Sequence, residues 1–193
     1  MNIDKVVAQF LLSPNIRHQH ADIRTLKQSA VLIPIIAIEE QAQLILCKRS
    51  PELASHPSQI CFPGGKVEQQ DVTLVNTALR ETAEEIHLAT NEAQVLGTLP
   101  AMHTLSGYQI TPVVANINST ASWSTQSDEV AHTFVVPLAA LANTSNWQQL
   151  TLRYRGKDIN LEGFMTPHGL LWGATAKIIQ QLLKTIQPQD RHW

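Results

Sequence analysis

The 193-residue chain is long enough for one substantial domain and too short for two comfortable ones, so we expect a single domain over residues 1–193. Apolar residues make up 44% of the sequence and charged residues 16%, which is typical of globular proteins. A net charge of −2 supplies no general basic field, so we expect no nucleic-acid partner and only local phosphate binding.

The apolar segments are too short to cross a membrane. The longest run, residues 30–38, is far below the roughly 20 residues that a span requires, and the first ten residues lack a signal-peptide pattern. We therefore expect a cytoplasmic protein with no membrane partner. Cys47 and Cys61 are too few for a disulfide framework and are expected to be reduced, and the scattered histidines give no zinc-binding spacing.

The first half of the chain predicts a helix, a set of strands and a second helix. Residues 2–12 carry a helical apolar stripe within an N-terminal helical extension, residues 1–29. Residues 29–38 and 43–50 are β-rich runs separated by a polar turn. Residues 60–66 predict a strand entering a glycine turn, and residues 71–86 are good helix formers without Gly or Pro. The order is strand, glycine loop, helix.

The second half is richer in strands. Residues 93–100, 108–117, 132–141 and 149–154 predict strands or strand-rich pieces, and a closing helix is expected from about Trp172 to Ile186. We found no internal repeat or low-complexity tract that would mark a domain boundary. The pattern predicts the α/β class, with a mixed sheet and helices packed on it.

The helix predicted over residues 71–86 has an acidic face. At about 100° per residue, four residues gather on one side, Val75, Leu79, Thr82 and Ile86. Three glutamates gather roughly opposite, Glu81, Glu84 and Glu85. Carboxylates at this spacing repel one another, and a hard divalent cation such as magnesium or manganese would offset the repulsion. The alternative is a solvent-exposed acidic face with Arg80 beside it. Judged from the three carboxylates alone, this alternative is favoured.

Residues 65–88 resemble the Nudix box of the Nudix hydrolases. The matching positions are Gly65, Arg80, Glu81, Glu84, Glu85 and Leu88. The sequence departs from the family pattern at three positions. Asp71 stands in place of glutamate with one extra residue before Arg80, Thr82 replaces an aliphatic residue, and His87 replaces the last glycine. The resemblance implies a Nudix fold, a mixed β-sheet sandwiched between α-helices.

A second resemblance covers roughly residues 30 to 183. The stretch before the Nudix box is similar to the extra signature of coenzyme A pyrophosphatases, with matches at Arg49, Ser50, Leu53, His56, Gln59, Ile60, Phe62, Pro63, Gly64 and Gly65. Cys47 and Ser58 depart from that signature. The resemblance implies metal-dependent hydrolysis of the pyrophosphate of coenzyme A, or of its derivatives, to 3′,5′-ADP and 4′-phosphopantetheine.

The resemblance also implies roles for individual residues. Glu81 and Glu85 are expected to bind magnesium or manganese, with Glu84 as a further ligand, and Arg80 to hold a glutamate in position. The group that accepts the proton of the attacking water stays open among Glu84, Glu85 and Glu129.

Substrate binding is expected at six residues of the upstream signature, the side chains of Lys48, Arg49, His56 and Gln59 and the glycines Gly64 and Gly65. Their alternatives are a solvated strand end for Lys48 and Arg49 and loop-fixing hydrogen bonds for His56 and Gln59. Gly64 and Gly65 are expected to shape the loop before the catalytic helix, or to make a purely structural turn.

Two competing functions stay open. One is a Nudix pyrophosphatase that acts on another nucleoside diphosphate derivative, such as ADP-ribose or a dinucleotide. The other is a catalytically silent Nudix-like module that binds a nucleotide or a protein. The sequence leaves the oligomeric state open, a homodimer being one option.

Overall fold

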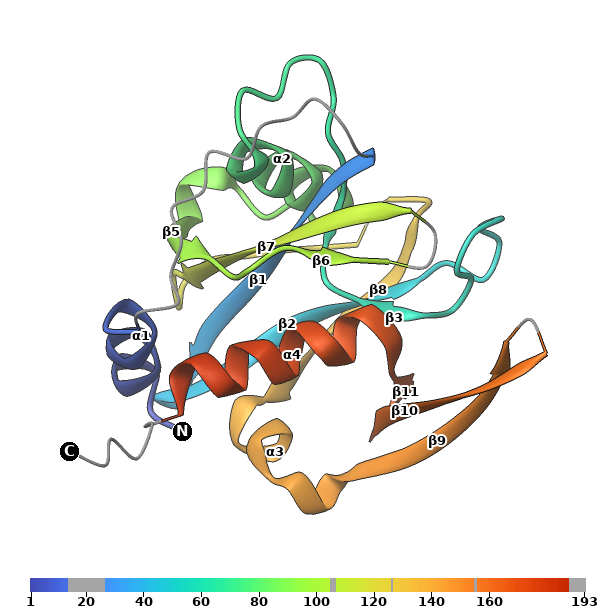
Figure 1. Ribbon diagram of the computed structural model, residues 1–193. Helices are drawn as coiled ribbons and strands as arrows, with labels where there is room; N and C mark the ends of the chain where they lie inside the picture. The colour runs from blue at the N-terminus through green and yellow to red at the C-terminus, as the bar shows by residue number, and fades with distance from the viewer. Residues whose placement is uncertain (14–26, 105–106, 126, 155, 188–193) are drawn as a thin grey trace.

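The computed structural model describes residues 1–13, 27–104, 107–125, 127–154 and 156–187 (Figure 1). The helices are α1 (Ile3–Leu11), α2 (Leu74–Ile86), α3 (Leu138–Ala142) and α4 (Gly173–Ile186), with 3-10 turns at Thr90–Glu92 and Thr144–Asn146. The strands are β1 (Lys27–Ile38), β2 (Gln41–Arg49), β3 (Ile60–Cys61), β4 (Gly64–Lys66), β5 (Ala93–Thr98), β6 (Met102–His103), β7 (Tyr108–Ile117), β8 (Val130–Pro137), β9 (Trp147–Tyr154), β10 (Lys157–Thr166) and β11 (Gly169–Leu171).

The main sheet has eight strands and is mixed. Its central path runs β3-β2-β1-β7-β5, with β4 added beside β1, β6 beside β7 and β8 beside β2. β1 and β7 are parallel over ten residue pairs, from Lys27 with Tyr108 to Ile36 with Ile117. The described neighbours of this pair are antiparallel, among them β2, β4 and β5. The α/β prediction is therefore confirmed.

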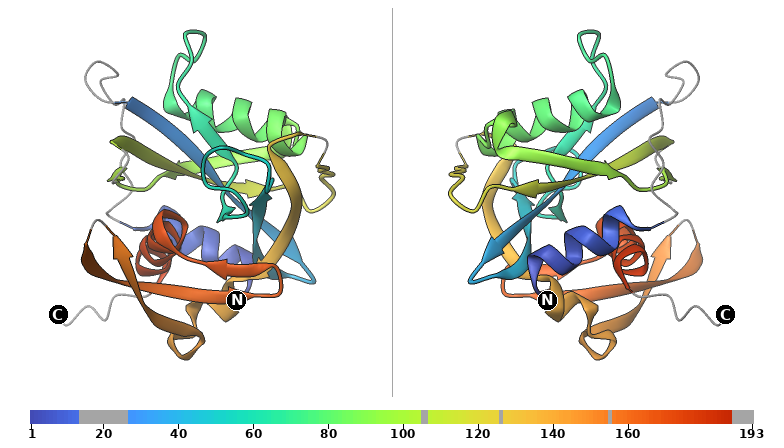
Figure 2. Two further views of the ribbon diagram at one scale, coloured as in Figure 1. Left: turned by 90° about the vertical axis from the view of Figure 1, so that its right-hand side faces the viewer. Right: turned by 90° about the vertical axis from the view of Figure 1, so that its left-hand side faces the viewer.

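Helices cover both faces of this sheet. α2 lies on one face, and α1 and α4 lie on the other (Figures 1 and 2). The side chains of β1 alternate accordingly, since Ile33 and Ile35 join the core with α1 and α4, whereas Leu32 and Ile36 join the core with α2. A strand that is buried on both faces reads as a nearly continuous apolar run, which explains residues 30–38. The predicted sandwich is confirmed.

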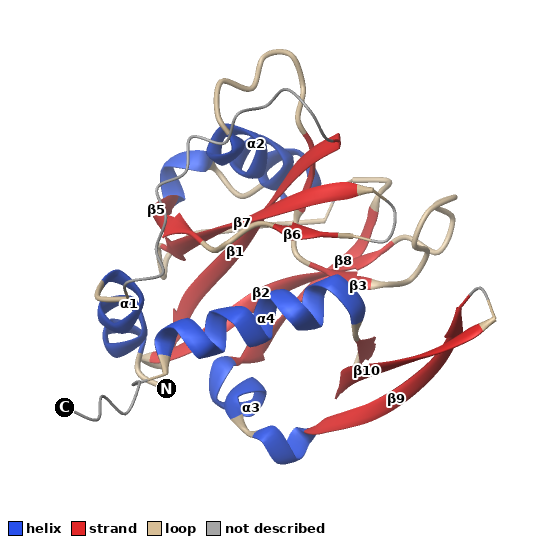
Figure 3. Cartoon of the chain, in the orientation of Figure 1, coloured by secondary structure: helices blue, strands red, loops and turns tan. Residues whose placement is uncertain are grey.

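A second sheet was only partly foreseen. It has three antiparallel strands in the order β11-β10-β9, and its β9–β10 hairpin extends away from the main body (Figure 3). The sequence predicted a strand near β9 but not β10 or β11. The β10 sequence, KDINLEGFMT, mixes charged residues and glycine with few β-branched residues, so pairing with β9 decides its conformation.

Two predicted boundaries are corrected by the structure. Residues 132–141 form a strand only to Pro137 and then continue as α3, because the strand reaches the edge of β2 and LAALA is a good helix-forming sequence. The N-terminal extension contains α1, capped by the Asn2 side chain, which accepts hydrogen bonds from the next turn. β1 already begins at Lys27, and residues 14–26 lie outside the described residues.

The assignment of residues 1–193 to one domain stays a prediction. Within the described ranges, the structure contains no helix with the length and apolar character needed to cross a membrane.

Candidate active site

α2 is anchored so that two of its three glutamates, Glu81 and Glu85, point toward β4. The helix begins after Thr73, whose side-chain oxygen accepts a hydrogen bond from the backbone N–H of Asn76 at 3.1 Å. Leu74, Ala78 and Ile86 are buried in the core that α2 shares with β1. This packing fixes the rotation of the helix about its axis, and therefore the direction in which its carboxylates point.

Two consecutive glycines receive two of these carboxylates. The backbone N–H of Gly64 donates a hydrogen bond to Oε2 of Glu85 at 3.0 Å. The Glu81 carboxylate lies against Gly65, where an added Cβ would be 2.3 Å from Glu81 Oε1. Glu81 and Glu85, one helical turn apart, thus both rest on the short strand β4.

The three glutamates do not form a common solvent face. Glu85 is only 5% exposed, Glu81 is half-buried, and Glu84 is exposed beside Arg80. The expectation of three carboxylates on a face opposite the core is therefore wrong for Glu85. Helical periodicity assigns a charged side chain to solvent, but here β4 covers that part of the helix.

Burial and like charge perturb both inner carboxylates. Burial raises the pKa of Glu85 to about 7, the charges of Glu81 and Glu129 add to this, and the Gly64 N–H and Arg49 oppose it. Burial also raises the pKa of Glu81, against the influence of Arg80. Glu81 and Glu85 therefore form a pair of carboxylates whose negative charge is only partly compensated by the protein.

Arg80 holds the outer part of the site together. Its guanidinium donates two hydrogen bonds to Asp71 at 3.0 and 2.9 Å, and others to Glu81 at 3.1 Å and Glu84 at 3.0 Å. It also donates to the carbonyl oxygen of Lys66 at 3.0 Å, which ties α2 to β4. Arg80 therefore contacts two of the three glutamates, in the geometry that the sequence suggested for a positioning role.

Asp71 is a site residue that the sequence presented only as a departure from the family pattern. It is buried, accepts from Thr77 at 3.0 Å as well as from Arg80, and its pKa is lowered to about 2 by the Arg80 hydrogen bonds. The carboxylate is therefore ionised and fixes the arginine. The signal was present in the sequence, since an acidic residue stands near this position of the pattern, but its burial was not readable.

The helix ends at His87, which adopts the left-handed conformation with φ 52° and ψ 27°. Glycine occupies this position in the family pattern because it takes positive φ without steric cost. His87 accepts the same geometry, its N–H donates to Ala83, and its ring contacts the Ser124 carbonyl at 3.3 Å. The substitution therefore leaves the helix end in place, and Glu85 remains directed at Gly64.

Of the four side chains expected to bind substrate, Arg49 is the one whose charge interacts with the Glu85 carboxylate. It forms an ion pair with Glu129 at 3.7 Å, and its charge opposes the rise in the pKa of Glu85. Its Nε is buried, and no hydrogen-bond partner for it is found in the described residues. Glu129, in the turn directly before β8, raises the pKa of both Glu81 and Glu85.

The other three are used differently. Lys48 donates a hydrogen bond to the carbonyl oxygen of His168 at 2.8 Å, which joins β2 to the β10–β11 turn. The side chains of His56 and Gln59 make no described contact with the carboxylates. The imidazole of His56 meets the side-chain amide oxygen of Gln59 at 3.0 Å within the exposed loop. Ser58, where the signature has glycine, takes φ 58° in that loop.

The chemistry of the inner pair suits a hard divalent cation. Magnesium and manganese prefer carboxylate oxygens, and Glu81 and Glu85 supply two such groups whose pKa values stay raised despite the nearby Arg80 and Arg49. In the described ranges, no three His, Cys, Asp or Glu side chains converge as a ready-made cage. Glu81 and Glu85 are therefore the residues around which a cation would be held, with Glu84 turned toward Arg80.

The chain was compared with known proteins. Residues 26–168 match the family model described as the NUDIX domain. A protein of Klebsiella pneumoniae (strain 342), named Uncharacterized Nudix hydrolase NudL, is 36% identical over 182 residues, covering 94% of this chain and 93% of its own length. Its namesake in Enterobacter sp. (strain 638) is 34% identical over 183 residues, with the same coverage. A solved Deinococcus radiodurans structure shares the fold, with a TM-score of 0.53, 13% identity, and coverage of 85% of this chain and 89% of that one.

Proposed function

Because the chain belongs to the Nudix hydrolase family, we propose that it hydrolyses coenzyme A. Members of this family act on pyrophosphate bonds and generally use divalent metal ions. The products are 3′,5′-ADP and 4′-phosphopantetheine. The observation that carries this proposal is the contact of Glu81 and Glu85 with Gly64 and Gly65, the last two residues of the stretch that resembles the coenzyme A signature. That signature contributes Arg49 to the same site.

Glu81 and Glu85 would hold magnesium or manganese, with Glu84 as a further ligand. Such an ion, when bound, neutralises charge on the pyrophosphate and acidifies the attacking water. The protein's own residues keep the carboxylates in place, because Gly64 orients Glu85 through its N–H and Arg80 orients Glu81. The buried Nε of Arg49 has no hydrogen-bond partner among the described residues, and it would donate a hydrogen bond to a substrate phosphate.

Two outer carboxylates are candidates for accepting the proton of the attacking water. Glu84 is exposed but engaged by Arg80 at 3.0 Å. Glu129 is exposed, comes from a different element, and interacts electrostatically with both inner carboxylates. Comparing the pH–rate profiles of Glu84→Gln and Glu129→Gln would separate these roles, since loss of the base removes the limb that its titration produces.

The proposed reaction is tested by incubating the purified protein with coenzyme A, with and without magnesium or manganese, and detecting products by mass. Metal-dependent formation of 3′,5′-ADP and 4′-phosphopantetheine is expected, with slower cleavage of ADP-ribose. Cleavage of ADP-ribose alone would support the alternative substrate class, and metal binding without cleavage of either would support a silent binding module.

Glu85→Gln should abolish metal-dependent turnover, by about a thousandfold or more, because a neutral amide cannot replace the inner carboxylate. The matched control is Glu40→Gln, an exposed glutamate in the turn between β1 and β2. The control should keep wild-type turnover, and both variants should remain folded by circular dichroism. Full activity of folded Glu85→Gln would contradict the assigned role.

A further inference from the structure

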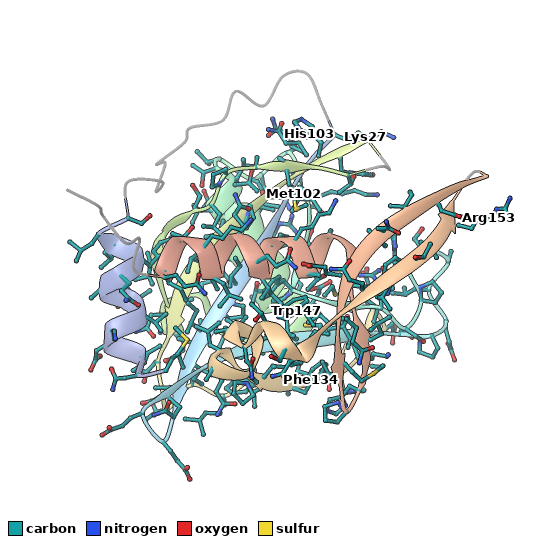
Figure 4. The ribbon with its side chains drawn as sticks, turned by 60° about the horizontal axis from the view of Figure 1, so that its bottom comes forward. Lys27, Met102, His103, Phe134, Trp147 and Arg153 are labelled. Atoms are coloured by element: carbon teal, nitrogen blue, oxygen red, sulfur yellow. The ribbon has the colours of Figure 1, made fainter. Side chains whose placement is uncertain are left out.

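Two lysines converge on one tyrosine at the end of the main sheet. The Nζ atoms of Lys27 and Lys66 lie 5.8 and 5.9 Å from the centre of the Tyr108 ring. Lys27 begins β1, Lys66 ends β4 and Tyr108 begins β7, so three strands contribute one residue each. Figure 4 labels Lys27 and His103 at this same end of the molecule, where β6 pairs with β7.

The strand registers place the three side chains on one face. Lys27 is opposite Tyr108 in the β1–β7 pair, and Lys66 is opposite Ser29 in the β1–β4 pair. Directly paired residues point to the same face, and residues two apart on a strand do too. The cluster is therefore built by the sheet and does not arise from a chance meeting of mobile side chains.

The cluster carries two positive charges that no described acidic side chain neutralises by an ion pair. Both lysines are exposed, and in the described part of the chain neither forms an ion pair. Each ammonium group gains only a weak, exposed cation–π contact, and two like charges near one ring repel each other. An anion bound between them would remove that repulsion.

The cluster lies next to the candidate active site along the chain. Lys66 directly follows Gly65, against which the Glu81 carboxylate rests, and its carbonyl oxygen accepts from Arg80. Gly65 faces α2, whereas the Lys66 side chain lies on the opposite face of the sheet. Among the described strands β4 pairs only with β1, so its other edge is free, and the two faces of the sheet meet at that edge. A ligand that passes around this edge can reach the carboxylates and the lysines together.

We propose that Lys27, Lys66 and Tyr108 form a subsite for a phosphate monoester that the substrate carries apart from its pyrophosphate, with the attached nucleoside against the Tyr108 ring. This inference rests on the proposed function and deepens it, since the 3′-phosphate of coenzyme A is such a group. Two ammonium groups match the charge of a phosphate dianion, and a tyrosine ring suits the face of a base or a ribose. The subsite makes the second phosphate a determinant of specificity.

The kinetic test compares coenzyme A with dephospho-coenzyme A, which lacks only the 3′-phosphate. The wild type should have a higher kcat/KM on coenzyme A than on dephospho-coenzyme A. In the double variant Lys27→Gln/Lys66→Gln, kcat/KM on coenzyme A should fall by about tenfold or more, whereas kcat/KM on dephospho-coenzyme A should stay within about twofold of the wild-type value. Lys66→Arg, which keeps the charge, should retain most of the preference. Lys184→Gln, an exposed lysine on α4, is the matched control and should leave both substrates unaffected.

An equal loss on both substrates, or no loss on either, would overturn the subsite. A binding measurement keeps this result separate from the proposed reaction, because it needs no turnover. By calorimetry, the wild type should bind adenosine 3′,5′-bisphosphate about tenfold more tightly than AMP, and the double variant should bind the two equally. Equal binding by the wild type would reject the subsite. Failure of the wild type to cleave coenzyme A, with the binding preference intact, would reject the proposed reaction alone.

Discussion

Gly64 and Gly65 are adjacent in the sequence but are required for different reasons. A methyl group at Gly65 would lie 2.3 to 2.6 Å from the carboxylate atoms of Glu81, which form the movable end of a side chain. Gly65→Ala should therefore displace Glu81 and leave the backbone in place. We expect turnover to fall by about tenfold or more, with a melting temperature within roughly 3 °C of the wild type, measured by steady-state kinetics and thermal unfolding.

Gly64 supplies the contrasting case for that prediction. Its φ is 151°, and a methyl group would lie 2.4 Å from the Ala30 carbonyl oxygen and 2.5 Å from the Val31 Cα, both of them backbone atoms. Gly64→Ala should lower the free energy of unfolding by about 2 kcal/mol or more, because β1 and β4 must separate. If Gly65→Ala proved the more destabilising of the two variants, the distinction drawn here would be wrong.

At the scale of the element, the end of α2 stores a small strain at His87. A non-glycine residue in the left-handed region costs about 1 kcal/mol relative to glycine, and His87→Gly should recover most of it. For a protein of this size the gain corresponds to a rise of roughly 2–4 °C in melting temperature.

The control for His87→Gly is His87→Ala. Alanine loses the ring contact with Ser124, as glycine does, but keeps the Cβ that disfavours positive φ. Thermal unfolding should rank glycine above histidine and alanine below it. A glycine variant that melts below the alanine variant would show that the backbone conformation at residue 87 carries no strain.

The elements that the sequence predicted best are those specified by local signals. The helix over 71–86 has a Thr73 cap and continuous helix formers, and β1 has an apolar run long enough to be buried on both faces. β10 and β11 lack such signals, and they form because β10 pairs with β9 and β11 pairs with β10. The Nudix box located the glutamates, but not the burial of Glu85, which depends on how β4 packs on α2.

Contacts between distant segments were beyond the reach of the sequence. Lys48 lies in the coenzyme A signature, yet its ammonium group donates a hydrogen bond to the carbonyl oxygen of His168, in a turn far along the chain. The Lys27, Lys66 and Tyr108 cluster likewise depends on two strand registers that no local pattern encodes. The roles of the site residues stay predictions, to be decided by the variants described above.

At the scale of the whole molecule, Glu85 should link global stability to pH. Its pKa is raised from 4.5 to about 7 on folding, so the folded protein binds the proton more tightly than the unfolded chain. Its contribution to stability is therefore complete below about pH 4.5 and is lost as the pH rises through about 7. Glu81, shifted in the same direction, adds to this trend.

Urea unfolding between pH 5 and pH 8, in the presence of a chelator, measures this linkage. The wild type should lose stability across the interval, and Glu85→Gln, which cannot titrate, should show a flatter profile. Glu84→Gln is the matched control, since this exposed carboxylate should leave the profile unchanged. A Glu85→Gln profile as steep as that of the wild type would assign the dependence to other groups.

The parallel pairing of β1 with β7 has a consequence for how the protein is made. Every carboxylate of the Nudix box lies between these two strands in the sequence, inside a long loop that the β1–β7 ladder closes. During synthesis, a chain that has grown only as far as Leu88 already carries Glu81, Glu84 and Glu85. It still lacks the strand that covers one edge of β1, and closing so long a loop is slow. The emerging chain must therefore keep the apolar β1 edge from other partners until residue 117 has left the ribosome, and the Nudix-box glutamates are synthesised well before the sheet that supports them is complete.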